Sequence, residues 1–190
     1  DRAIIKRGLD WLDSMNYRCD LVFKREFRRN YEYDYDLKRV FPFPFSVFGK
    51  PNPSWLLYEN RISSKKERQN DCFWAGSPIF RNDEYEDQFC DRAGILNKIN
   101  NHLSTKSALD HNKFLNEISE HKFFLHLNGT GHLCKRFFEG LSVGSLMMLQ
   151  STDLVFPFDD GDFFLDETIF NSPEDFIQKL NILKIIVKKM

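Results

Sequence analysis

Residues 122–145 read KFFLHLNGTGHLCKRFFEGLSVGS, and this stretch decides the fold. Its apolar run from Lys122 to Leu127 predicts a buried strand, and the two glycines that follow predict a tight loop. Residues 132–143 have the apolar spacing of a helix, and a glycine turn separates them from a second apolar run at 146–149. Strand, loop, helix and strand in this order are typical of a unit with parallel strands.

The predicted helix has one apolar arc and a polar remainder. At about 100° per residue, its apolar side chains share one side, whereas Lys135, Arg136, Glu139 and Ser142 lie outside that arc. Arg136 and Glu139 are neighbours, because side chains three positions apart meet on a helix surface. Spacing alone favours an ordinary surface ion pair between them. The alternative is that both face an anionic ligand near the helix start, where free N–H groups and the helix dipole favour negative charge.

The alternation of strands and helices continues on both sides of this stretch. The further elements that we expect are a strand at 71–78 ended by a Gly-Ser-Pro turn, helices at 89–103 and 111–120, and a closing helix at 173–189. Ser172 is a typical N-cap for the last helix, since Pro173 and two acidic residues follow it. The predicted fold class is therefore α/β, with a Rossmann-like parallel sheet flanked by helices.

The first part of the chain has a different character. We expect a helix at 3–15, a strand at 20–24 and a packed linker at 28–53, in which Phe alternates with Pro and excludes a helix. The domain organisation that follows is an amino-terminal unit with its linker over 1–48, and a Rossmann-like domain over 49–190.

Composition excludes several classes of function. The chain has 190 residues and a formal net charge of -1, which argues against a protein that grips nucleic acid through its phosphates. No run approaches the roughly 18 apolar residues of a membrane span. Four widely spaced cysteines form neither a zinc motif nor a small disulfide framework, so we expect reduced thiols and a cytoplasmic location. The start lacks an initiator Met and a signal peptide, so the chain is expected to be cut from a longer protein.

The motif Arg136-x-x-Glu139-Gly140-Leu141-x-x-Gly144, preceded by a strand and a glycine-rich loop, resembles the donor-binding segment of GT-B-fold glycosyltransferases. The likeness is to the exostosin-like and spore-maturation-type families. It is strongest over residues 71–189 and moderate over 20–48. It implies that the chain is the donor-binding half of such an enzyme, and that the missing amino-terminal half supplies acceptor recognition.

The resemblance implies a site for a nucleoside-diphosphate sugar, UDP- or GDP-linked. Glu139 would hold the ribose and Arg136 the diphosphate, with Gly76 and Ser77 near the phosphates. The loop that faces phosphate and sugar would comprise Asn128, Gly129, Thr130, Gly131 and His132. His132 is the one weak candidate for a catalytic residue, and a cap neighbour is the plainer interpretation.

The implied activity is metal-independent transfer of a hexosyl or pentosyl group to a glycan or another hydroxyl acceptor, with no cofactor. No metal site is expected: the acidic run 159–162 lacks the further ligands of a calcium loop. Retaining members carry a second glutamate eight positions before the first, where this chain has Gly131, so retention or inversion stays open. The alternative function is a non-catalytic interaction module that docks a partner through the aromatic segment 31–58.

Overall fold

The computed structural model describes residues 14–15, 22–24, 40–42, 67–78, 91–107, 109–128, 135–151 and 166–189. The chain divides into two compact units, Asp1–Pro44 with Asp153–Asp160, and Phe45–Thr152 with Gly161–Met190. In the first unit, β1 (Val22–Lys24) pairs in parallel with β2 (Val40–Pro42). The predicted strand at 20–24 is therefore present over its described residues, and the Phe-Pro segment of the linker begins as an extended strand.

The second unit contains a sheet of five strands, all parallel. Its elements in chain order are β3 (Gln69–Ala75), α3 (Arg92–Ile99), the 3-10 turn η3 (Asn100–His102), β4 (Leu103–Lys106), α4 (His111–Glu120), β5 (His121–His126), α5 (Lys135–Ser142), β6 (Leu146–Gln150), the 3-10 turn η4 (Asp166–Thr168), β7 (Ile169–Phe170) and α7 (Pro173–Lys189). The strand order across the sheet is β4-β3-β5-β6-β7. The α/β class predicted from the sequence, a Rossmann-like parallel sheet with helices, is confirmed.

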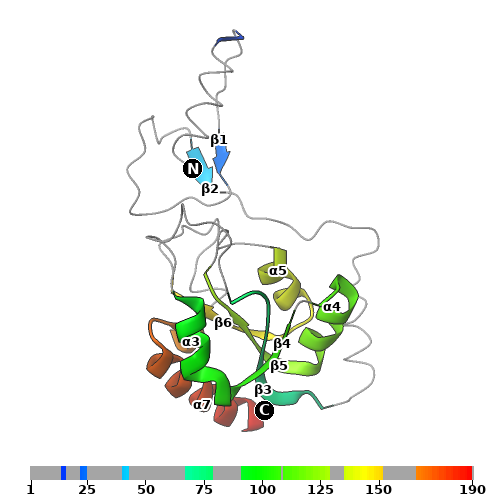
Figure 1. The fold of residues 1–190 in the computed structure, drawn as a ribbon, viewed down its shortest axis with the longest axis vertical. Coiled ribbons are helices and arrows are strands. Elements are labelled where there is room, and N and C mark those ends of the chain that lie inside the picture. The colour runs from blue at the N-terminus through cyan, green and yellow to red at the C-terminus, as the bar shows by residue number, and fades with distance from the viewer. Residues whose placement is uncertain are drawn as a thin grey trace. The chain divides into compact units, whose positions relative to one another are not determined.

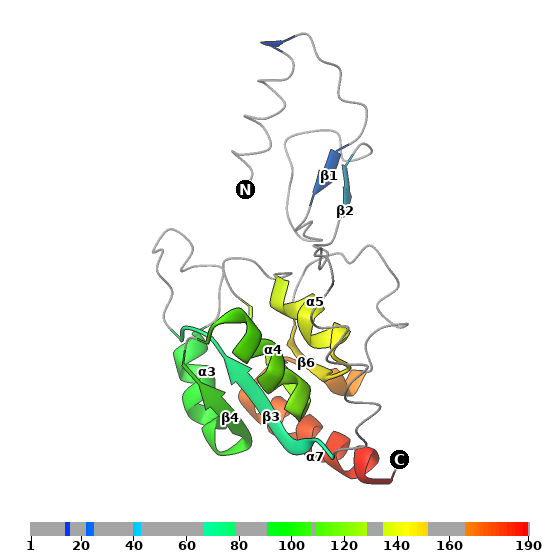
Figure 2. The ribbon, with the colours of Figure 1, turned by 90° about the vertical axis from the view of Figure 1, so that its right-hand side faces the viewer.

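Helices cover both faces of this sheet, so it is doubly wound. Helices α3 and α7 pack together on one face, and α4 and α5 pack together on the other (Figure 1, Figure 2). The first strand of the sheet, β3, lies inside it, with the second strand on one side and the third on the other. This order creates a point between β3 and β5 from which the chain winds in opposite directions, and such points are where doubly wound sheets bind ligands.

Burial on both faces explains the apolar strands. In β3, Cys72 and Trp74 belong to the core on the α3 and α7 side, and the alternate residue Phe73 is equally buried. In β5, Phe123 belongs to that same core, whereas Phe124 lies against α4 and contacts the ring of Phe114 at a centroid distance of 5.9 Å. Parallel strands buried on both sides are continuously apolar rather than alternating. Most of the phenylalanine side chains in the described part of this unit therefore lie in the core.

Two short strands of the five-stranded sheet, β4 and β7, were not expected from the sequence. The predicted helix 89–103 is wrong at both ends: Asp91 is the N-cap of α3, and Leu103 already begins β4. Asn100–His102 form the 3-10 turn that ends the helical path, and only four residues of edge strand follow it. Strand β7 has two residues, too few for a periodic pattern.

The start of α7 is as predicted. The Oγ atom of Ser172 accepts a hydrogen bond from the backbone N–H of Asp175 at 3.1 Å. The carboxylate of Asp175 in turn accepts from the backbone N–H of Asn171 at 2.9 Å. One N–H group of the first helical turn thus finds a partner, and the residue before the N-cap is fastened to the same turn. No helix among residues 67–78, 91–107, 109–128, 135–151 and 166–189 is long and apolar enough to cross a membrane.

The N-cap of α4 makes stability depend on pH. The backbone N–H of Lys113 donates to Asp110 and lowers the pKa of its carboxyl below the ordinary value of 3.8. Because folding lowers this pKa, the cap stabilises the folded state fully at pH values above 3.8. That stabilisation is lost as the pH falls through the pKa of the folded state. We expect Asp110→Ala to lower the thermal midpoint at pH 7 by a few degrees, and this difference to shrink below pH 3.8.

Asp110→Asn is the matched variant, because Asn also caps a helix but does not titrate in this range. It should stay close to the parent at pH 7, as followed by circular dichroism. An equal loss for Asn and Ala would show that the cap bond is not what stabilises this helix start.

Candidate functional site

The carboxyl ends of β3 and β5 lie side by side at the point where the winding direction changes. Arg92, in the first turn of α3, links the two ends. Its guanidinium donates to the backbone oxygen of Asn128 at 2.8 Å and to that of Ser77 at 3.3 Å. Arg92 thereby fixes the distance between the segment that follows β3 and the segment that follows β5.

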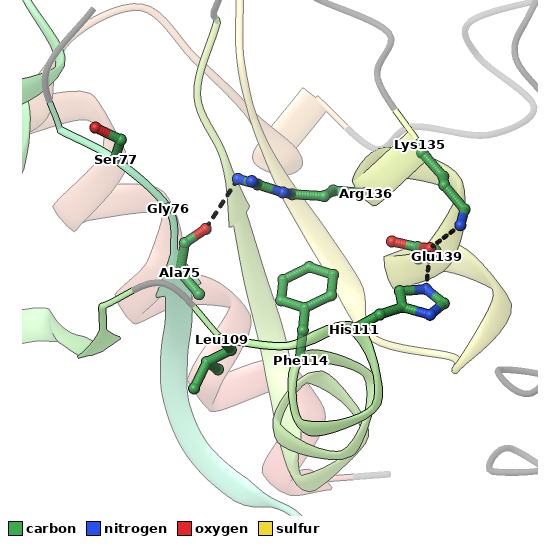
Figure 3. A pocket seen from close by; sticks show the side chains of 9 residues that line it. All are labelled: Ala75, Gly76, Ser77, Leu109, His111, Phe114, Lys135, Arg136 and Glu139. Atoms are coloured by element: carbon green, nitrogen blue, oxygen red, sulfur yellow. Dashed lines mark hydrogen bonds and ion pairs between the residues drawn. The ribbon is translucent and has the colours of Figure 1, made fainter.

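A cavity of about 400 Å³ opens beside this edge of the sheet. Figure 3 shows side chains from the end of β3, the start of α4 and the start of α5 arranged around it. Its lining residues are Ala75, Gly76, Ser77, Leu109, His111, Phe114, Lys135, Arg136 and Glu139. The volume lies in the range of about 300–1,000 Å³ that is usual for small-molecule sites. Four of the predicted site residues, Gly76, Ser77, Arg136 and Glu139, thus meet at one cavity.

Glu139 is the buried carboxylate of this site. Its side chain is 3% exposed, although it lies outside the apolar arc of its helix, because it faces α4. The Oε1 atom is 2.6 Å from Nε2 of His111 and 3.4 Å from Nζ of Lys135 (Figure 3). The surface ion pair between Arg136 and Glu139 that spacing favours is therefore wrong, since this carboxylate is buried and its side-chain partners among the described residues are His111 and Lys135.

Arg136 crosses from α5 to the end of β3. One nitrogen of its guanidinium donates to the backbone oxygen of Ala75 at 3.2 Å. The guanidinium carbon lies 5.8 Å from the ring centroid of Phe114, within the range of a cation–π contact. Gly76 leaves the room for this approach: a Cβ there would lie 2.9 Å from the guanidinium nitrogen. The arginine is thus fixed at the cavity wall, and only one of its five N–H donors goes to Ala75.

The other predicted site residues have different surroundings. Ser77 is exposed at the cavity rim. Asn128 is buried, and its side-chain amide donates to the backbone oxygen of Ser151 at 2.9 Å, which joins the ends of β5 and β6. The four residues 129–132, which include the catalytic candidate His132, lie outside the described residues. So does most of the aromatic segment 31–58.

Sequence reasoning missed three residues that matter here. His111, Phe114 and Arg92 come from two helices that are distant in the chain from the glycine loop. A signal for His111 did exist, because the first turn of a helix that follows a parallel strand lies at the carboxyl edge of the sheet. No pattern marks Arg92, whose partners include backbone oxygens fifteen and thirty-six positions away.

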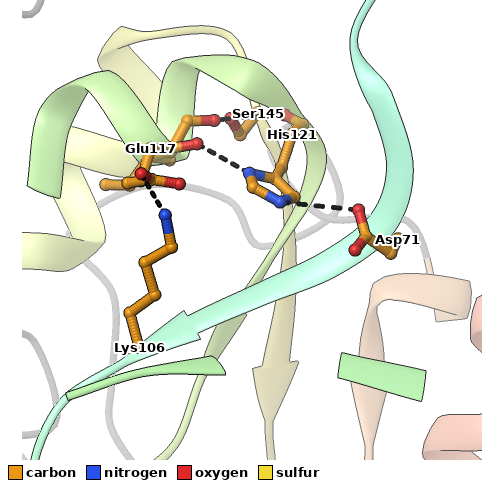
Figure 4. A network of polar contacts seen from close by, with 6 residues as sticks. Asp71, Lys106, Glu117, His121 and Ser145 are labelled. Atoms are coloured by element: carbon orange, nitrogen blue, oxygen red, sulfur yellow. Dashed lines mark hydrogen bonds and ion pairs between the residues drawn. The ribbon is translucent and has the colours of Figure 1, made fainter. Parts of the chain in front are cut away.

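A second polar cluster lies at the amino edge of the sheet (Figure 4). The buried ring of His121 bonds through Nδ1 to the backbone oxygen of Glu117 at 2.7 Å, and its Nε2 lies 3.5 Å from Asp71. The ring stacks on Phe73 at a centroid distance of 4.9 Å. Ser145 donates to the backbone oxygens of Ile118 and His121. Away from this edge, Lys106 at the carboxyl end of β4 pairs with Glu117 of α4. These contacts fasten α4 to the sheet, so we assign them to structure.

The described residues contain no group of three or more side chains suited to hold a metal ion. Cys72 is a free thiol with no exposed surface, and burial raises its pKa far above the ordinary value. A thiol with a raised pKa is a poor nucleophile and a poor metal ligand. His126 is also buried, in β5, with its ring edge-on to Phe137 at 5.4 Å. The chemistry of the site therefore depends on Arg136, Lys135, His111 and Glu139.

Fold and site together define an α/β protein with a doubly wound parallel sheet and a charged cavity at its carboxyl edge. No protein-family model matches the chain, and no curated protein sequence matches it either.

Proposed function

We propose that this chain is the donor-binding domain of a glycosyltransferase that uses a nucleoside-diphosphate sugar. The observation that carries the proposal is the pairing, in one cavity, of an arginine and a lysine with a buried, oriented carboxylate. Cations suit a diphosphate, and a fixed carboxylate suits the hydroxyl pair of a ribose. The resemblance of the motif from Arg136 to Gly144 supports the same two roles.

The position of the cavity also supports this function. It lies at the carboxyl end of β3, where α4 and α5 begin. Helix starts favour anions, because their first N–H groups have no partner within the helix. Phe114 gives the cavity an apolar wall, which a nucleoside needs in addition to charge. A site for an uncharged sugar alone would not require two permanent cations.

In the proposed reaction the bond between the anomeric carbon and the diphosphate oxygen breaks, and a bond to the acceptor oxygen forms. The acceptor hydroxyl loses its proton to a base of the acceptor-side unit, and the nucleoside diphosphate leaves with the electron pair. Arg136 and Lys135 would stabilise the negative charge that develops on the diphosphate. Glu139 would bind the ribose and so orient the donor. The acceptor class is a glycan or another hydroxyl compound.

Calorimetric titration tests the proposal, with UDP, GDP and their sugar conjugates and without added metal. We expect the chain to bind one nucleotide class. Arg136→Ala should weaken binding by about tenfold to a hundredfold, since a hydrogen bond to a charged group contributes about 1.5–3 kcal/mol. The difference in affinity between the parent and Arg136→Ala should become smaller at high salt, because screening reduces what the arginine charge contributes to binding in the parent.

Lys98→Ala is the control variant. It removes one positive charge from the last turn of α3, on the other face of the sheet, and should leave binding unchanged. Absence of any nucleotide binding by the parent, or equal loss in both variants, would contradict a donor site at this cavity. In that event the interaction-module alternative, with segment 31–58 as its docking surface, becomes the better hypothesis.

A further inference from the structure

The contacts of Glu139 are unequal at its two oxygens. Both nitrogen partners, Nε2 of His111 and Nζ of Lys135, approach the same atom, Oε1. The other carboxylate oxygen points away from them, toward the side of the cavity where Arg136 lies (Figure 3). One oxygen is thus held by the protein, and the second is turned to the space that a ligand would fill.

Burial makes the partners of this carboxylate necessary. A carboxylate that is 3% exposed has little water to stabilise its charge. Without hydrogen-bond donors such a group takes up a proton or turns toward solvent. A protonated carboxyl donates through one oxygen, whereas an ionised one accepts through both. The ability of Glu139 to accept from a ligand hydroxyl therefore depends on the donors at Oε1.

His111 is the closer of the two donors. Its Nε2 lies 2.6 Å from Oε1, against 3.4 Å for Nζ of Lys135. An ionised carboxylate can only accept, so Nε2 of His111 is the donor of this contact when Glu139 is ionised. His111 is also held at its backbone, in the first turn of a helix whose N-cap is Asp110. The two side chains are similarly exposed, 46% for His111 and 54% for Lys135, so the shorter contact is what distinguishes His111.

We propose that His111 is a positioning residue for ribose recognition: its contact with Oε1 fixes the orientation of the Glu139 carboxylate, so that the other carboxylate oxygen selects a ligand with ribose hydroxyls. The proposal rests on the proposed function and extends it, since it assigns the selectivity for ribose to a residue that does not itself touch the ribose. Under this proposal two parts of the ligand are recognised by different residues. Glu139, positioned by His111, binds the ribose hydroxyls, and Arg136 binds the diphosphate.

The test compares, on the full 190-residue chain, the nucleoside diphosphate that binds more tightly, UDP or GDP, with its 2′,3′-dideoxy form and with inorganic pyrophosphate. The parent should prefer the ribose form by about tenfold or more, which corresponds to one lost hydrogen bond to a charged group. His111→Ala should bring that ratio close to one and leave pyrophosphate affinity within a factor of about two. His111→Gln, whose amide can place an N–H near the Nε2 position, should restore much of the preference.

His102→Ala is the matched control, since His102 lies in η3, directly before β4 at the amino edge of the sheet. It should keep the full preference for ribose. An unchanged preference in His111→Ala, with nucleotide binding intact, overturns the role of His111 and leaves the donor site standing. A uniform loss of affinity for all three ligands means general disruption and also overturns it. If the parent binds no nucleotide, the proposed function and this extension both fail.

Discussion

Phe124→Ala should lower the free energy of unfolding by about 3–5 kcal/mol, the usual range for removing a buried phenyl ring. The ring is 2% exposed in β5. It lies 5.9 Å from Phe114 and 6.4 Å from Phe73 by ring centroids, so one substitution removes contacts with both α4 and β3. Urea denaturation measures the change, as a lower midpoint with an unchanged slope.

Phe138→Ala is the control for this prediction. Phe138 lies in α5 and is only partly buried, so removing its ring leaves a smaller cavity. It should cost clearly less than Phe124→Ala in the same denaturation experiment. If the two substitutions lower the free energy of unfolding by similar amounts, the interior on this face of the sheet relaxes around the missing ring of Phe124.

The sheet interior was predictable because its strands are buried on both sides. Continuous apolar runs mark β5 and β6, and the spacing of apolar residues marks α4 and α7. The edge strand β4 reads Leu-Ser-Thr-Lys and is partly exposed, so it has no such run. A strand of this kind is defined by its hydrogen bonds to β3, which are tertiary contacts that no local pattern contains.

The candidate site was predictable only along one helix. The motif led to Arg136 and Glu139, and both line the cavity. Helical spacing could not reveal that Glu139 is buried, because that depends on the packing of α4 against α5. His111 reaches Glu139 across that packing, from twenty-eight positions earlier in the chain. Pairings of this kind follow from topology, and a sequence pattern predicts them only once the sheet order is known.

Gly140→Val should also destabilise strongly, by about 3 kcal/mol, the upper end of the usual range for overpacking. Gly140 is buried where α5 crosses the sheet, and a Cβ there would lie 2.8 Å from Cε of Met147 and 2.9 Å from Cδ1 of Phe124. The methyl group of Met147 can move, but the ring of Phe124 is enclosed. The helix must then shift outward, and Glu139 and Arg136 shift with it. Nucleotide affinity should fall together with the thermal midpoint.

Valine has a higher helix propensity than glycine, so propensity does not explain a loss in Gly140→Val. Ser142→Val is the control, because Ser142 is partly exposed on the same helix. It should cost less than 1 kcal/mol, about the full difference between ordinary residues on the propensity scale.

A double-mutant cycle then locates the clash. Met147→Ala destabilises the parent by opening a cavity, but in Gly140→Val it also makes room for the new side chain. The loss in the double variant should therefore be smaller than the two single losses together. Strict additivity would mean that the valine is accommodated elsewhere and that α5 does not depend on a glycine for its distance from the sheet.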